Sequence, residues 1–161
     1  MPALRCAPAV ASQKHRGCLR RFAAYDLRVS FSVAVYWPPN EDMGDAIDEV
    51  ERCLFTSPVA SDGDMYQLWN MPSIQLGLPL LAGVYEEGLE AHGEVLHALS
   101  HELQSLSAYW IATVPDTETK STTIENRSFE VPLLVHLMNR AEVVESAIQL
   151  ALAIGGYLTL S

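Results

Sequence analysis

Cysteine is scarce in this sequence, and no segment is apolar for long enough to cross a bilayer. The three cysteines, Cys6, Cys18 and Cys53, cannot all pair with one another, so they form no disulfide framework. The longest apolar run, residues 147–160, is shorter than a membrane-spanning helix and contains Gln149. We therefore expect a cytoplasmic protein that folds without disulfide bonds and does not insert into a membrane.

Motifs for common enzyme chemistries are also missing. The sequence contains no Gly-x-Ser-x-Gly nucleophile elbow, no glycine-rich phosphate loop and no dinucleotide-binding fingerprint. The segment that begins at His97 and ends at Glu102 has two histidines four residues apart. It is not a zincin motif, because its glutamate follows the second histidine instead of lying between the two. These absences favour a protein that is not an enzyme and needs no cofactor.

Basic residues become rare after the first part of the chain. The net charge is −10, but residues 1–21 contain five basic residues and no acidic one. Residues 22–161 contain the other five basic residues and all 20 acidic residues, a net charge of −15. From Glu41 to Glu118 there are fifteen acidic residues and one basic residue, Arg52. The electrostatic field of so much negative charge repels nucleic acid and anionic membranes and attracts basic proteins.

Composition also divides the chain into two parts. Residues 1–22 are rich in Ala, Arg and Ser and show no helical or strand periodicity, which predicts a disordered basic leader. Residues 23–161 have the length and hydrophobic content of one globular domain. We expect this domain to be α+β, with a mixed or antiparallel sheet of about four to six strands and three helices packed on it.

Local patterns place the elements of this domain. Strict alternation of apolar residues predicts a strand over residues 27–35, and an apolar stripe after Asn40 predicts a helix that ends near Leu54. The expected elements after it are a long surface connection over 56–72, a hairpin of two short strands over 74–78 and 80–85, a helix over 86–107, a strand over 108–114, a polar loop over 115–126, an edge strand over 129–137, a helix over 139–154 and a last strand over 157–160.

The acidic surface gives the first functional hypothesis. We expect a small acidic inhibitor, similar to an immunity protein or an anti-defence protein, that blocks a basic partner such as a toxin, a nuclease or a nucleic-acid-binding protein. It would not bind nucleic acid directly. Aromatic residues with a polar rim are typical interface anchors, so two of them join the acidic residues in the predicted contact set. The set is Glu41, Asp42, Asp45, Asp48, Glu49, Asp62, Asp64, Tyr66 and Trp69.

Two alternatives belong to other classes. If residues 86–107 are one helix, Glu90, Glu94, His97 and His101 share a face, and two histidines four apart can bind a transition metal. The leucine stripe of this helix, made of Leu89, Leu96, Leu99, Leu103 and Leu106, predicts that the opposite face points to solvent, which favours an ordinary solvated surface. The leucine stripe itself includes His92, and alternation predicts that His136 points outward from the edge strand. The other alternative is a structural subunit that pairs its edge strand, residues 131–137, in a homo-oligomer.

Overall fold

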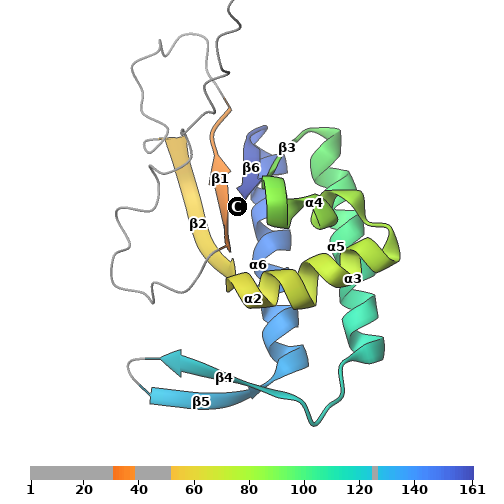
Figure 1. The fold of residues 1–161 in the computed structure, drawn as a ribbon. Coiled ribbons are helices and arrows are strands. Elements are labelled where there is room, and N and C mark those ends of the chain that lie inside the picture. Colours follow the sequence, from red (N-terminus) through yellow and green to blue (C-terminus); the bar gives the residue numbers. More distant parts are fainter. Residues whose placement is uncertain (1–30, 39–51, 125–126) are drawn as a thin grey trace, which may run out of the picture.

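The computed structural model describes residues 31–38, 52–124 and 127–161. In chain order the elements are β1 (Phe31–Tyr36), β2 (Cys53–Ala60), α2 (Asp62–Asp64), the π-helical segment η4 (Met65–Asn70), α3 (Met71–Leu76), α4 (Pro79–Glu87), β3 (Leu89–His92), α5 (Glu94–Thr113), β4 (Thr119–Ile124), β5 (Arg127–Pro132), α6 (Leu133–Ile154) and β6 (Tyr157–Leu160). A four-stranded antiparallel sheet has the order β2-β1-β6-β3, and β4 and β5 form a separate two-stranded sheet. The α+β prediction is confirmed (Figure 1).

The centre of the main sheet is made of β1, whose apolar residues alternate, and of β6. Val33 of β1 lies opposite Leu160 of β6, and Val35 lies opposite Leu158, so their side chains share one face of the sheet. All four of these side chains are buried. The predicted last strand is confirmed as β6. The predicted first strand is confirmed from Phe31, and residues 27–30 lie outside the described residues.

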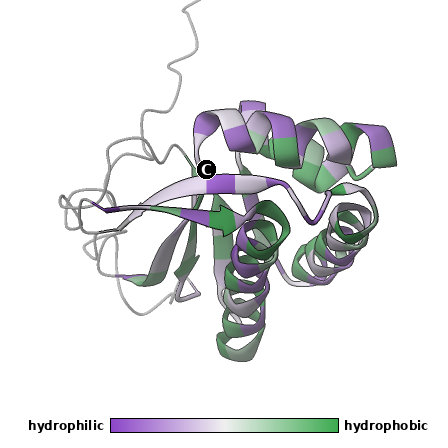
Figure 2. Ribbon diagram, turned by 90° about the horizontal axis from the view of Figure 1, so that it is seen from below, coloured by the Kyte–Doolittle hydropathy of each residue, from purple (hydrophilic) through white to green (hydrophobic). Residues whose placement is uncertain are grey.

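Two long helices cover this apolar face. Helix α6 packs against β1, β2, β6 and the antiparallel helix α5. Leu96, Leu99, Leu103 and Leu106 of α5 are buried at helical spacing, which confirms this part of the leucine stripe, whereas Leu89 lies on strand β3. Figure 2 shows hydrophobic and hydrophilic residues on different sides of these helices, as expected for helices that bury one side in a core.

The helix–strand junction before β6 depends on two adjacent glycines. Gly155 ends α6 in a left-handed conformation (φ 63°), as the sequence predicted. Gly156 has a different requirement. A Cβ atom at Gly156 would lie 2.1 Å from the carbonyl oxygen of Tyr36, so only glycine allows β6 to approach β1 this closely.

The predicted connection over residues 56–72 and the hairpin over 74–85 are wrong. Strand β2 continues to Ala60, and its Pro58 is tolerated because β2 is an edge strand of the sheet. The Ser61 hydroxyl accepts a hydrogen bond from the Asp64 amide (3.3 Å) and starts a helical run through α2, η4 and α3. Gly77 ends that run with φ 69°, and Pro79 is the first residue of α4. The glycine and proline that suggested a hairpin turn therefore join two helices.

The π-helical segment lies just before a proline in the helical run. In an α-helix the amide of residue 72 would donate to the Leu68 carbonyl, but Pro72 has no N–H group. The indole N–H of Trp110 on α5 donates to that carbonyl instead (2.8 Å). The helical run is thereby attached to α5 at the point where its own hydrogen bonding is altered.

Helix α4 obtains its N-terminal cap from another helix. Its N-cap residue, Leu78, offers no side-chain hydrogen bond. The carboxylate of Glu102 on α5 accepts hydrogen bonds from the amides of Leu80 (3.2 Å) and Leu81 (2.9 Å). Glu102 is buried, and its negative charge lies at the positive end of the α4 dipole.

The other predicted boundaries need four corrections. The helix expected over 86–107 begins at Glu94 and continues to Thr113, because Trp110 extends its buried stripe through the predicted strand 108–114. The predicted loop over 115–126 contains β4. The predicted edge strand over 129–137 ends at Pro132, and helix α6 begins directly after it. Residues 53–54 belong to β2 and not to a helix. The rest of that predicted helix falls on residues 40–52, of which residues 40–51 lie outside the described residues.

Candidate binding surface

The structure separates the members of the predicted contact set. Glu41, Asp42, Asp45, Asp48 and Glu49 fall in residues 39–51, outside the described residues. Of the four members that are described, Asp62 and Tyr66 are exposed. Asp62 is in the first turn of the helical run, where its charge is favourable, and Tyr66 is on η4.

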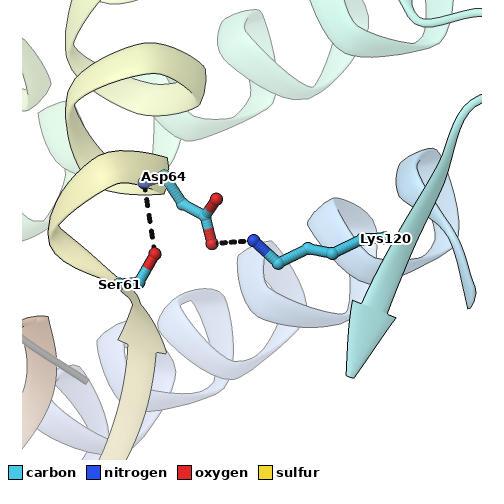
Figure 3. A network of polar contacts seen from close by, with 3 residues as sticks. All are labelled: Ser61, Asp64 and Lys120. Atoms are coloured by element: carbon cyan, nitrogen blue, oxygen red, sulfur yellow. Dashed lines mark hydrogen bonds and ion pairs between the residues drawn. The ribbon is translucent and has the colours of Figure 1, made fainter. Parts of the chain in front are cut away.

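Asp64 makes an ion pair within the chain. Its carboxylate accepts a hydrogen bond from the ammonium group of Lys120 on β4, and its amide donates to Ser61 (Figure 3). This is the single ion pair among residues 31–38, 52–124 and 127–161. A basic partner would therefore have to compete with Lys120 for this carboxylate.

Trp69 is a core residue, which corrects its prediction as a surface anchor. Its side chain is 1% exposed and packs edge-on against Trp110, with ring centroids 5.0 Å apart. Met65 is equally buried, whereas Tyr66 between them is 45% exposed. The sequence did not reveal this because the segment was interpreted as a loop, and a loop has no buried face. Helical geometry turns Met65 and Trp69 inward.

His136 lies near the charges of Lys120, Arg140 and Asp64. His136 is on helix α6 and is partly buried, so the prediction that it points outward from a strand is wrong. Burial lowers the pKa of His136 below 6.5, and the nearby positive charges of Arg140 and Lys120 lower it further, while Asp64 acts in the opposite direction. Arg140 also donates a hydrogen bond to the Pro58 carbonyl (2.9 Å). These contacts link the β4–β5 sheet, helix α6 and strand β2.

The structure does not bring the residues of the metal-binding alternative together. Glu94, His97 and His101 lie on α5 and are exposed, as the leucine stripe predicted. Glu90 and His92 are on strand β3, so neither is part of that helix. Within the described parts of the chain, no three His, Cys, Asp or Glu residues come close enough to hold a metal ion. The metal-dependent enzyme stays an untested alternative.

The structure reveals another acidic surface, which we call the acidic corner: Glu86, Glu87, Glu90 and Glu94. These residues span the last turn of α4, strand β3 and the first turn of α5, and all four side chains are exposed. None makes a hydrogen bond or an ion pair with a described residue. The sequence signal was present, because Gly88 follows Glu87 as a helix-ending glycine would. It was missed because the segment was assigned to one continuous helix.

The acidic corner contains a small hollow of about 120 Å³. It is lined by Glu87, Gly88, Leu89, Glu90, Thr159 and Ser161. Glu90 and Thr159 lie opposite each other in the β3–β6 pairing, so their side chains share one face of the sheet. Thr159 is only 9% exposed, and its hydroxyl makes no hydrogen bond with a described residue. The hollow thus combines two exposed carboxylates with the hydroxyl of a mostly buried threonine.

The basic side chains of the described residues lie elsewhere. Lys120, Arg127 and Arg140 belong to β4, β5 and α6, and Arg52 directly precedes β2. Among the described residues, none of the acidic-corner elements α4, β3 and α5 carries a Lys or Arg. The acidic corner is therefore a run of exposed carboxylates on elements that carry no basic residue.

Comparison with known proteins identified no relative: no family model, no curated protein and no solved structure matches this chain. Within the described residues, none of the helices has both the length and the apolar character needed to span a bilayer.

Proposed function

We propose that the protein binds a basic partner protein through the acidic corner and inhibits it by covering a cationic site. A toxin, a nuclease or a nucleic-acid-binding protein fits this description. In this proposal the chain has no catalytic role. Asp62 and Tyr66 remain possible contacts because they are exposed, and residues 41–49 remain predicted ones.

The position of Glu86 and Glu87 carries the proposal. Both are in the last turn of α4, where the helix dipole is negative and where that helix has no basic residue. Carboxylates at this end cost roughly 0.3–1 kcal/mol each, and Glu90 adds further repulsion. A cationic partner would relieve this repulsion. The stability of the free chain gives no reason for such an arrangement, whereas binding of a cation does.

The hollow indicates how a basic side chain would be recognised. A Lys ammonium or an Arg guanidinium in it would meet the carboxylates of Glu87 and Glu90, and could donate to the Thr159 hydroxyl. Charge-assisted hydrogen bonds of this kind are about twice as strong as neutral ones. A bare metal ion fits less well, because Ca²⁺ needs about six to eight oxygen ligands.

The test uses the immobilised full-length chain, an extract of its native source at low salt, and mass spectrometry of the proteins eluted by salt. We expect one basic protein to be captured by the wild type and lost with the double variant E87Q/E90Q. The matched control is D116N/E142Q, which changes the net charge equally at exposed positions outside the acidic corner.

Two results would contradict the proposal. One is the absence of any basic protein that discriminates between the two double variants. The other is a captured basic partner whose binding is unchanged by each of E86Q, E87Q and E90Q, because these three carboxylates belong to the acidic corner.

A further inference from the structure

We propose that two copies of this chain associate through the outer edge of β4. The hairpin formed by β4 and β5, residues 119–132, is called the arm below. It lies at the lower end of α6, apart from the four-stranded sheet (Figure 1). Antiparallel pairing of β4 with β4 of a second copy would join two arms into one four-stranded sheet around a two-fold axis. This inference is independent of the acidic corner.

The backbone hydrogen bonds show which groups point away from the hairpin. The Leu133 amide donates to the Glu118 carbonyl (2.8 Å), so this opposite pair is hydrogen-bonded. In an antiparallel ladder, hydrogen-bonded and non-hydrogen-bonded pairs alternate. The next pair in the register, Thr119 with Pro132, is therefore not hydrogen-bonded, and the same holds for the pairs of Ser121 and Thr123. The amides and carbonyls of Thr119, Ser121 and Thr123 thus point away from β5. No described strand pairs with this outer edge of β4.

The two edges of the arm differ in their ability to pair. On β5 the outward positions are Ser128, Glu130 and Pro132, and Pro132 has no N–H to donate. On β4 all three outward positions keep their donors. Proline is one of the devices that protect an edge strand from pairing, and here it protects β5 only. Of the two edges of the arm, that of β4 keeps its donors and is paired with no strand among the described residues.

The outward residues of β4 are complementary to themselves. Pairing centred on Ser121 places Thr119 of each copy opposite Thr123 of the other. Thr–Thr pairs on neighbouring strands are favourable, and these three side chains are exposed and uncharged. The arm has only two strands and is held to the body by the ion pair of Lys120 with Asp64 and by contacts with α6, and pairing with a second arm would add backbone hydrogen bonds along β4.

Charge also favours a second copy at this edge. Two molecules of net charge −10 repel each other over most of their surfaces. Strand β4 has one charged residue, Lys120, and Asp64 of the same chain neutralises it. In the antiparallel pairing, Arg127 of one copy and Glu118 of the other would lie on the same face of the joined sheet. Their backbones would be two strand spacings apart, about 10 Å. Both side chains are exposed and long enough to meet across that distance.

The first experiment measures the mass of the full-length chain by sedimentation equilibrium over a concentration series. We expect a monomer–dimer equilibrium for the wild type and a monomer for S121P, because proline removes the central outward donor of β4. The matched control, S128P, removes an outward donor of β5 and should still form the dimer. A wild-type protein that stays monomeric, or an S121P variant that folds and still dimerises, overturns the inference.

Exchanging the charges of Arg127 and Glu118 tests the proposed β4–β4 register without introducing a proline. R127E and E118R should each weaken the dimer by roughly tenfold, and the double variant R127E/E118R should recover most of the wild-type affinity. This pair decides the question if S121P fails to fold. Failure of the double variant to recover would exclude the proposed register.

Discussion

At the scale of single residues, the carboxylate of Glu102 connects the start of α4 to the middle of α5. It accepts two backbone hydrogen bonds in a buried position, where an unpaired amide is costly. Sequence reasoning placed this residue correctly in a helix but gave it no function. Its partners, Leu80 and Leu81, are more than twenty residues away, and they belong to a segment that was predicted as a strand.

Replacement of Glu102 should therefore destabilise the fold. We expect E102A to lose about 2–4 kcal/mol of unfolding free energy, because two amides lose their acceptor, and E102Q to lose about half as much. Urea denaturation followed by circular dichroism measures both. E142Q is the control, since Glu142 is exposed on α6, and it should stay within about 0.5 kcal/mol of the wild type. Equal stability of E102A and E142Q would show that the Glu102 hydrogen bonds contribute little.

The environment of His136 predicts a dependence of stability on pH. Its pKa is lowered in the folded protein, so the unfolded chain binds a proton more readily. The stability that the neutral imidazole supports is present above pH 6.5 and is lost as the pH falls below that value. The difference in denaturation midpoint between pH 7.5 and pH 5.5 should shrink in H136Q. It should persist in H97Q, which removes an exposed histidine of α5.

At the scale of elements, glycine and proline marked the boundaries correctly but did not identify what they separated. Gly77 and Pro79 were interpreted as a hairpin turn, yet they end one helix and begin the next. Pro132 was expected inside a strand, and it is the last residue of β5 before α6. Short apolar segments suit a strand or a buried helix equally well, so tertiary packing decided the outcome. The strictly alternating β1 was not ambiguous in this way, whereas the first residues of α6, 133–137, were predicted as strand.

The two glycines before β6 give a prediction at this scale. G155A should cost about 1 kcal/mol, because its left-handed backbone disfavours a side chain although the space is open. G156A should cost roughly 3 kcal/mol or more, because the new methyl group would collide with the Tyr36 carbonyl and push β6 away from β1. Thermal denaturation of the two variants makes the comparison. Similar losses would mean that the β1–β6 contact relaxes easily.

At the scale of the whole molecule, composition and periodicity predicted the α+β class and the sheet with helices on it. They could not predict which carboxylates would gather, because this depends on how α4, β3 and α5 meet in space. The acidic corner arises where a helix ends, a short edge strand follows and the longest stretch of buried leucines begins. A count of charges along the chain contains no information about that junction.

The tryptophans are distributed unevenly between the body and the arm. Trp69 and Trp110 are buried against each other in the body, and residues 119–132 contain neither tryptophan nor tyrosine. Tryptophan fluorescence therefore reports on the packing of α5 against the helical run and on the half-exposed Trp37 after β1, and the arm contributes no tryptophan to it. A melting curve followed by tryptophan fluorescence could look complete even though the arm had already come apart. Backbone probes such as amide hydrogen exchange are needed to see it.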